Sequence, residues 1–537
     1  MSIGRRSVLG AALVVTAITV LARVGGLGRN FVFARAVGFN CVSDTYATVN
    51  TVPNILYEIL AGGALASLVV PLLATAVAGG DREQVSRTSS ALLTWTVCSL
   101  TVVSVVVAVA AHPISSWLLG AKDCPGAVDV GASMLRVFAP QIVLYGVGIV
   151  FTGILQAHRR FGAPAVAPLL SSLVVICAYV GYALVTPADP SLVELSTVSE
   201  LMLSVGTTLG VVALTCSLIV PLSGLGLALR PTWQLPHGIG SRARALGAAG
   251  VTSLTAQQMS VVVALLLSNA HDVPAGSTAA FFQAQTVYYL PWAVLAVPLA
   301  TSAFPRLTQL WGLDRRSEYR LELAAATRAT VTLALVATAG LVAAADPIAR
   351  VIAQSAPGEP AVEPVAHGIA AFAFGLTGYA LFALLSRALY ASHAARNTAI
   401  ACLGGWLGVI VADLVLAGAL DGDDRVLALA LGNSVGMTLL GVSLMVATLH
   451  RAGNGAFSGL GAAALVAVGA SVLSGALGWW VAQLWSGGGI AAALAQTLAV
   501  GAVVVAVFAG TMFVLARETT TQTVAELRRR GMAHSHE

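Results

Sequence analysis

Three arginines interrupt the first long apolar stretch of the chain, ITVLARVGGLGRNFVFARAVGF: Arg23, Arg29 and Arg35. An ionisable side chain at membrane depth costs about 3 kcal/mol on insertion scales, so it usually faces a cavity or a partner. The planar guanidinium group matches phosphate oxygens in pairs. Arg23 and Arg29 in one water-filled cavity would therefore suit a diphosphate or another polyanion.

The alternative is that these arginines pair with carboxylates inside the membrane, for which Asp44, Glu58 and Asp413 are the candidates. Arg35 differs from the other two arginines because it lies near the predicted outer end of its span. Asp44 opens the next span, so we expect Arg35 to snorkel or to form a local ion pair. For Arg23 and Arg29, residue chemistry leaves both readings open.

Glycines and prolines accompany these charges and are candidates for hinges or gates. Glycine weakens a helix and permits a bend or a close approach, and proline interrupts the helical hydrogen bonds. Broken helices at matching places in two halves of a transporter point to binding and gating, whereas small-residue packing between helices is the alternative. The residues concerned are Gly25, Gly26, Gly28, Pro53, Gly62, Gly63 and Pro291.

The elements that carry these residues are membrane spans. Of the 537 residues, 57% are hydrophobic and 9% charged, whereas soluble chains carry about 25% charged residues. The apolar residues form long runs and do not alternate with polar ones, which predicts helices rather than a barrel. A length of about 20 apolar residues per span predicts fourteen helices, with the first two tilted or broken: 8–37, 44–77, 86–111, 130–156, 163–186, 199–222, 245–270, 279–304, 325–345, 364–390, 397–420, 426–449, 458–483 and 488–516.

Charge placement supports this count and gives the orientation. With the N-terminus inside, most of the 28 Lys and Arg residues fall at inner ends and loops, as positively charged cytoplasmic loops require. Both termini are then cytoplasmic, and Arg23, Arg29 and Arg136 are the basic residues left within spans. The arginine-rich segment 306–328 predicts an amphipathic helix on the inner membrane surface, with a solvated linker as the alternative.

Weak internal similarity predicts a duplication of six helices. QAHRRF at 156–161 resembles ASHAAR at 391–396, and three further segments match in order at nearly the same offset. Because six is even, the two halves share one orientation and are related by a pseudo-two-fold axis along the membrane normal. We therefore predict an all-α polytopic protein with these parts: an N-lobe at 1–222, a C-lobe at 223–450, two extra helices at 451–516 and a cytoplasmic tail at 517–537.

Several chemistries have no signature in the chain. No G-x-x-x-x-G-K-[ST] motif is present, which argues against ATP-driven pumping, and the scattered His and Cys residues suggest no metal site and no cofactor. Basic residues form no block or stripe, so nucleic acid is not an expected partner. Cys41 and Cys124 both fall in predicted outer loops, where they either form a disulfide or remain free thiols.

The segment 22–73, ARVGGLGRNFVFARAVGFNCVSDTYATVNTVPNILYEILAGGALASLVVPLL, resembles the start of the MurJ/MviN family. ILQAHRRFGAPAVAPLL at 154–170 and LAVPLATSAFPRL at 295–307 are also similar to family segments, and the first of them looks most like the actinobacterial branch. The resemblance implies a flippase of the MATE-like multidrug/oligosaccharidyl-lipid/polysaccharide superfamily, and so a transporter rather than an enzyme.

The resemblance also implies a cargo and a mechanism. The cargo would be lipid II, the polyprenyl-diphosphate-linked peptidoglycan precursor, moved across a bacterial plasma membrane for cell-wall synthesis. Two lobes would alternate access, helices 13 and 14 would form a groove for the lipid tail, and proteins of cell-wall synthesis or division are the implied partners. The alternatives are a cation-coupled multidrug exporter, a flippase for another lipid-linked oligosaccharide, and a non-transporting scaffold of the cell-wall machinery.

Position by position, the resemblance is partial. Arg23 and Arg29 match the two first-helix arginines of the family, and Asp44 matches the acid that opens its second helix. Elsewhere the chain departs from the family pattern, with Asn30 in place of an acid, Tyr57 and Glu58 in place of arginines, Gly62 in place of an acid, and Gln285 and Thr286 in place of an Asp-Arg pair. The predicted substrate-binding residues are Arg23, Arg29, Asn30, Asp44, Tyr57, Glu58, Gln285 and Thr286.

Overall fold

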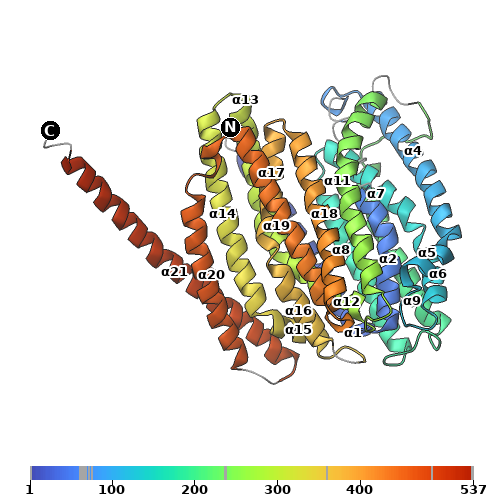
Figure 1. Cartoon of the computed structure of the whole chain (residues 1–537). Coiled ribbons are helices and arrows are strands. Elements are labelled where there is room, and N and C mark those ends of the chain that lie inside the picture. The colour runs from blue at the N-terminus through green and yellow to red at the C-terminus, as the bar shows by residue number, and fades with distance from the viewer. Residues whose placement is uncertain are drawn as a thin grey trace. The chain divides into compact units, whose positions relative to one another are not determined.

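The computed structural model describes residues 3–59, 69, 73, 76–234, 239–358, 361–484 and 488–533, and within these ranges the chain is helical with no β-strand (Figure 1). The helices up to the middle of the chain are α1 (Ile3–Ala36), α2 (Cys41–Ile59), α4 (Arg82–Val109), α5 (Ala111–Leu119), α6 (Ala127–Phe138), α7 (Gln141–Ala157), α8 (Gly162–Val185), α9 (Thr197–Ser217), α10 (Ile219–Ser223), α11 (Ile239–Ser268) and α12 (Ser277–Pro291). The later helices are α13 (Val297–Gly312), α14 (Arg316–Ala343), α15 (Ala345–Ala353), α16 (Val362–Ala373), α17 (Leu376–Ala391), α18 (Ala395–Ala419), α19 (Arg425–Ala452), α20 (Leu460–Gln483) and α21 (Ile490–Ala533).

These helices make the chain a polytopic membrane protein. Within the described ranges, ten helical segments are long and apolar enough to cross a bilayer, and α16 with α17, bent by 45°, makes an eleventh. All eleven coincide with predicted spans. The other three predicted spans, 8–37, 44–77 and 245–270, coincide with α1, α2 and α11, whose side chains or ends are only partly described. The count of fourteen therefore stays a prediction.

The chain divides into two units. Unit 1 comprises residues 1–283 with the segments 355–361 and 417–426, and unit 2 comprises 284–354, 362–416 and 427–537. The boundary at Gln283 lies inside α12. The lobe limits that we predicted at residues 222 and 450 stay a prediction.

In unit 1, α8 packs between α1 and α9. Glycine permits this close approach, because a Cβ added at Gly25 would lie 2.8 Å from Leu169 Cδ1, and one added at Gly206 would lie 2.2 Å from Ala178 Cβ. Gly26 and Gly28 have open space around them. The α1 helix continues unbroken through all three glycines of its first long stretch, so close packing is what the structure shows for Gly25.

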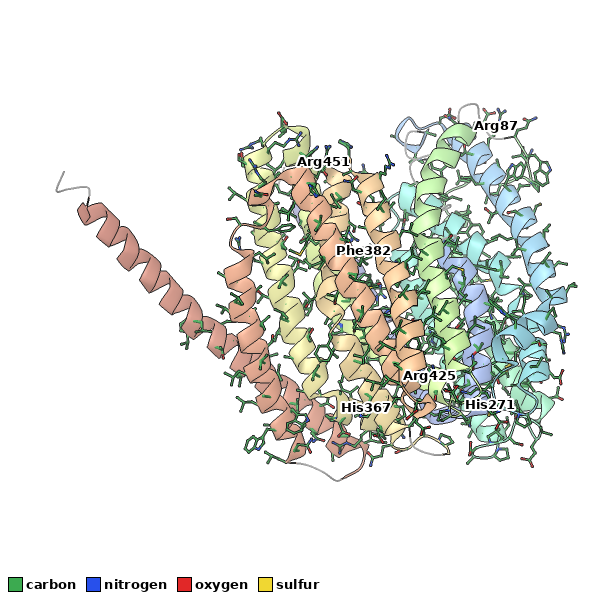
Figure 2. All side chains as sticks on the ribbon, in the orientation of Figure 1. Arg87, His271, His367, Phe382, Arg425 and Arg451 are labelled. Carbon is green, nitrogen blue, oxygen red and sulfur yellow. A yellow bond between two sulfur atoms is a disulfide. The ribbon has the colours of Figure 1, made fainter. Side chains whose placement is uncertain are left out.

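The two ends of unit 1 differ in their side chains. Figure 2 labels Arg87 at one end and His271 and Arg425 at the other. Arg87 forms an exposed ion pair with Glu83 at 2.6 Å, whereas Arg425 is buried and pairs with Asp272 at 2.6 Å. The predicted orientation makes the Arg87 end cytoplasmic.

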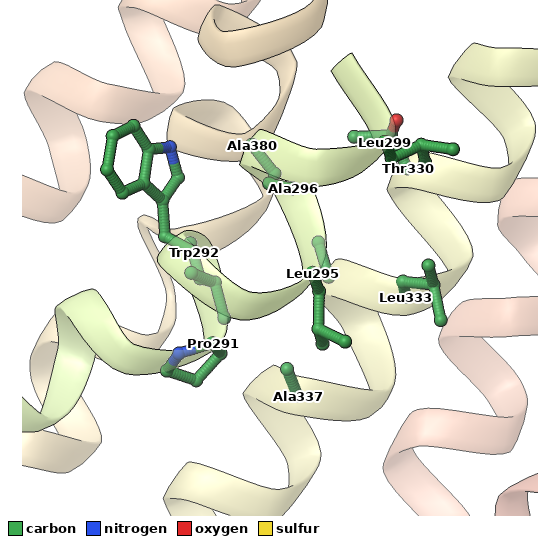
Figure 3. A pocket seen from close by; sticks show the side chains of 11 residues that line it. Pro291, Trp292, Leu295, Ala296, Leu299, Thr330, Leu333, Ala337 and Ala380 are labelled. Atoms are coloured by element: carbon green, nitrogen blue, oxygen red, sulfur yellow. The ribbon is translucent and has the colours of Figure 1, made fainter. Parts of the chain in front are cut away.

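In unit 2, α14 contacts α13, α17, α20 and α21. Pro291 has no N–H for the carbonyl of Val287, and a π-helical turn, η2 (Trp292–Ala296), follows it before α13 begins. The helix is therefore rearranged after Pro291 without being broken, and the hinge or gating role of Pro291 stays a prediction. Figure 3 shows a void beside the turn that is lined mainly by apolar side chains and has a volume of only about 10 Å³. That volume is about one water molecule, too small for a substrate.

The segment 306–328 is not a surface helix. The α13 helix continues to Gly312 and α14 begins at Arg316, so the segment consists of two helix ends joined by a short turn. The guanidinium of Arg316 lies 3.5 Å from the ring centroid of Trp311 across this turn. The prediction was wrong because arginines that mark a membrane surface can equally extend a spanning helix beyond it.

Candidate substrate site in unit 1

Arg23 and Arg29 lie on α1 without an ion pair or a side-chain hydrogen bond to any residue that the structure describes. The Arg23 side chain is exposed and that of Arg29 is half-buried. Six residues separate them, which is a rise of about 9 Å along a helix. Two unpaired cations on one helix remain available to bind an anion.

Arg29 lies among tyrosines from three other helices. The hydroxyl groups of Tyr46, Tyr145 and Tyr179 lie within electrostatic range of its positive charge. The Tyr46 hydroxyl hydrogen-bonds those of Tyr179 at 2.8 Å and Thr207 at 2.6 Å, and these three side chains are buried. The cluster joins α2, α8 and α9, so buried hydroxyl groups lie in the neighbourhood of this arginine.

A cavity of about 260 Å³ lies between α2, α7, α8 and α9. Tyr57 and Tyr145 line it, with their ring centroids 4.6 Å apart. The Tyr145 hydroxyl donates a hydrogen bond to Asn54 Oδ1 at 3.1 Å. One of the two tyrosines that line the cavity therefore lies within electrostatic range of Arg29.

Thr152 and Gln156 also line this cavity and were missed by the sequence reasoning. With Tyr145 they occupy positions i, i+7 and i+11 of α7, which fall on one helix face. The signal was visible in LYGVGIVFTGILQA, where these three residues are the polar ones in an otherwise apolar run. A polar stripe on an apolar span could have been recognised as a cavity lining.

Asp44 does not pair with an arginine. Its carboxylate forms an ion pair with Lys122 Nζ at 3.1 Å, and both side chains are 1% exposed. It also accepts hydrogen bonds from the backbone N–H groups of Gly276, at 2.8 Å, and Ala279, at 3.0 Å, at the N-terminus of α12. Lys122 in turn donates to the carbonyl of Pro274 at 2.9 Å. These contacts leave the predicted role of Asp44 in substrate binding without structural support, and it stays a prediction.

Within the described residues, the other two carboxylates considered as arginine partners do not pair with an arginine either. Glu58 is exposed, follows Tyr57 on α2 and forms no ion pair within the described part of the chain. Asp413 belongs to unit 2 and is 1% exposed, and its Oδ1 has no hydrogen-bond partner among the described residues. Arg35 also has no acid partner there, and lies 5.0 Å from the ring of Phe31.

The remaining predicted site residues are distributed over both units. The carbonyl of Asn30 accepts a hydrogen bond from Gln283 Nε2 at 2.9 Å within unit 1. Gln285 and Thr286 lie on the part of α12 that belongs to unit 2, and their contact with the substrate stays a prediction. Pro53 is buried inside α2 without ending it. Gly62 and Gly63 lie outside the described residues.

Cys41 and Cys124 are joined by a disulfide, with their Cα atoms 5.8 Å apart. The bond ties the start of α2 to the loop after α5, and this loop also carries Lys122. Both connections therefore hold the same end of unit 1. Over the described ranges, no three His, Cys, Asp or Glu side chains are grouped to bind a metal ion.

A family model described as "Lipid II flippase MurJ" matches residues 33–521, most of the chain. The match begins after Arg23 and Arg29. The lipid II flippase MurJ of Burkholderia cenocepacia is 26% identical over 389 residues, which cover 71% of this chain and 73% of that protein. The probable lipid II flippase MurJ of Synechocystis is 27% identical over 398 residues, 72% of each chain.

Solved structures show the same fold. A lipid II flippase MurJ in an inward closed conformation superposes with a TM-score of 0.76 at 17% identity, covering 95% of this chain and all of the other. A multidrug resistance MATE family transporter in an inward-facing conformation superposes with a TM-score of 0.63 at 13% identity, covering 82% of this chain and 98% of the other. At these identities the likeness is evidence for the fold.

Proposed function

Because the chain belongs to the lipid II flippase MurJ family, we propose that it moves lipid II from the inner to the outer leaflet of a bacterial plasma membrane. The activity is transport by alternating access, not catalysis. Both termini are cytoplasmic in this proposal, as the distribution of Lys and Arg predicts.

The observation that carries the proposal is the pair of unpaired arginines on α1. Lipid II contains a diphosphate, and an arginine binds phosphate oxygens through two parallel hydrogen bonds. Asp44, the acid nearest in sequence to Arg23 and Arg29, is already bound by Lys122. Arg23 and Arg29 are therefore free to bind the diphosphate, and Asn30 adds no competing negative charge beside Arg29.

The membrane potential favours this direction of transport. A potential that is negative inside favours outward movement of a bound anion by about 2.3 kcal/mol per charge per 100 mV. The arginines would partly neutralise the diphosphate while it crosses, and would then assist the return of the empty carrier, which is positively charged.

The test measures lipid II on the outer leaflet after depletion of the protein and re-expression of variants. We expect Arg23→Ala with Arg29→Ala to lower exposure at least about a hundred-fold, since each lost charge-assisted hydrogen bond costs about 1.5–3 kcal/mol. Arg136→Ala is the matched control, because Arg136 is an exposed arginine on α6 with no partner among the described residues. Normal exposure with the double variant, at equal protein level, would exclude the arginine mechanism.

A cation-coupled multidrug exporter is the second candidate, favoured by the likeness to MATE transporters and by the buried, unpartnered Oδ1 of Asp413. Deletion would then sensitise cells to several drugs while lipid II exposure stayed normal. A non-transporting scaffold would change neither drug sensitivity nor exposure.

A further inference from the structure

The cavity in unit 1 has a composition that suits a sugar more than a lipid tail or an ion. Sugars bind through several hydrogen bonds from neutral polar groups together with contacts to aromatic or apolar surfaces. The cavity offers two tyrosine rings and two proline rings, Pro164 and Pro168, beside Thr152 and Gln156. The side chains that line it carry no charge, and the charges of Arg29 and Glu58 lie within electrostatic range of its tyrosines without lining it.

Several of its polar groups are available to a ligand. The hydroxyls of Tyr57 and Thr152 and the side-chain amide of Gln156 form no hydrogen bond with any residue that the structure describes. Each is half-buried rather than fully exposed. Polar groups inside a protein normally have a partner, which can be protein, water or a ligand. A lipid tail in this cavity would leave all three unsatisfied.

The order of groups along α7 matches the order of groups in a glycosyl diphosphate. Tyr145 lies within electrostatic range of Arg29, and Thr152 follows about 10 Å further along the helix. Gln156 lies one turn beyond Thr152, about 6 Å away. In a lipid-linked saccharide the first sugar is bonded directly to the diphosphate, so a diphosphate at Arg29 would direct that sugar toward this face of α7.

The size of the cavity limits what it can hold. Its volume of about 260 Å³ is just below the range of about 300–1,000 Å³ typical of drug-sized ligands. It can therefore accommodate a single sugar ring, and the second sugar and the attached peptide of the cargo would lie outside it.

From this geometry we infer that Tyr57, Tyr145, Thr152 and Gln156 form a saccharide subsite, which binds the sugar next to the diphosphate of the cargo. The inference rests on the proposed function and deepens it. Arg29 recognises the charge, which every polyprenyl diphosphate carries, and the α7 face recognises the sugar, which only the loaded carrier lipid carries. The subsite thus discriminates cargo from the spent carrier lipid.

The experiment compares the binding of lipid II and undecaprenyl diphosphate to the purified full-length protein in nanodiscs, by native mass spectrometry. Undecaprenyl diphosphate has the same diphosphate and tail without the sugar. The wild-type protein should bind lipid II at least ten-fold more tightly. Thr152→Val with Gln156→Leu should remove about a ten-fold preference, because two neutral hydrogen bonds are lost, and should leave undecaprenyl diphosphate binding unchanged.

The matched control is Thr101→Val with Gln84→Leu on α4, which changes the same residue types at exposed positions away from the cavity. It should retain the wild-type preference. An unchanged preference in the Thr152/Gln156 variant overturns the subsite alone, since diphosphate binding shows that the variant is folded. A wild-type protein that binds neither lipid overturns the proposed function and the subsite with it.

Discussion

Asp44 and Lys122 allow a sharp test of how unit 1 is held together. The carboxylate serves two partners, the Lys122 ammonium and the N-terminus of α12, and both side chains are 1% exposed. Removal of one partner of a buried pair costs about 3–5 kcal/mol, because the other charge is left buried and unpaired. Loss of a helix cap adds about 1 kcal/mol. Asp44→Ala should therefore lower the free energy of unfolding by about 4–6 kcal/mol.

Lys122→Met should cost less than Asp44→Ala. The carboxylate keeps its two backbone N–H donors and the favourable end of the α12 dipole, so the loss should be about 2–3 kcal/mol. Asp44→Asn leaves the Lys122 charge without a counter-charge but keeps an oxygen for one N–H group. Addition of Lys122→Met to Asp44→Asn removes that stranded charge and should restore about 2 kcal/mol.

The assay is reversible unfolding in mixed micelles by titration with a denaturing detergent, followed by tryptophan fluorescence and circular dichroism. The diagnostic result is the order of stability, with Asp44→Asn below the double variant. If Lys122→Met further destabilises Asp44→Asn by its own full cost, the two residues are not coupled. If Lys122→Met costs as much as Asp44→Ala, the α12 N-terminus does not share the carboxylate. Either result would refute the reasoning.

Two further predictions concern covalent and steric constraints. Loss of the Cys41–Cys124 disulfide, which closes a loop of 83 residues, should lower the free energy of unfolding by about 4 kcal/mol. Cys98→Ser is the control variant. Alkylation of the unfolded protein should count four thiols before reduction and six after it. Gly378→Ala should destabilise unit 2, because the new Cβ would lie 2.1 Å from the carbonyl oxygen of Met437, whereas Gly404→Ala has open space and should be neutral in the same unfolding assay.

The apolar runs were enough to predict most of the helices. Eleven spans were placed from length and composition because a bilayer imposes both on any helix that crosses it. The prediction for segment 306–328 was wrong because arginine content marks the membrane surface but does not show whether a helix lies along that surface or crosses it. The π-helical turn after Pro291 was predicted only as an interruption, since proline removes a hydrogen bond without specifying how the helix rearranges.

The candidate site was predicted less completely. Arg23 and Arg29 could be proposed from the sequence because a charge in an apolar run stands out, and their role in substrate binding stays a prediction. The partner of Asp44 was not found, because Lys122 comes from a loop far away in the sequence and no local pattern links the two. Thr152 and Gln156 carry no charge, and only the packing of four helices shows that their face of α7 lines a cavity rather than another helix.

The burial of Lys122 has a practical consequence for chemical labelling. It is the single lysine of the chain, and its ammonium group is 1% exposed and held by Asp44. Amine-directed cross-linkers and biotinylating reagents would therefore find no exposed lysine side chain in the folded protein. An increase in amine labelling at Lys122 would report the opening of this end of unit 1 directly, without an engineered reporter.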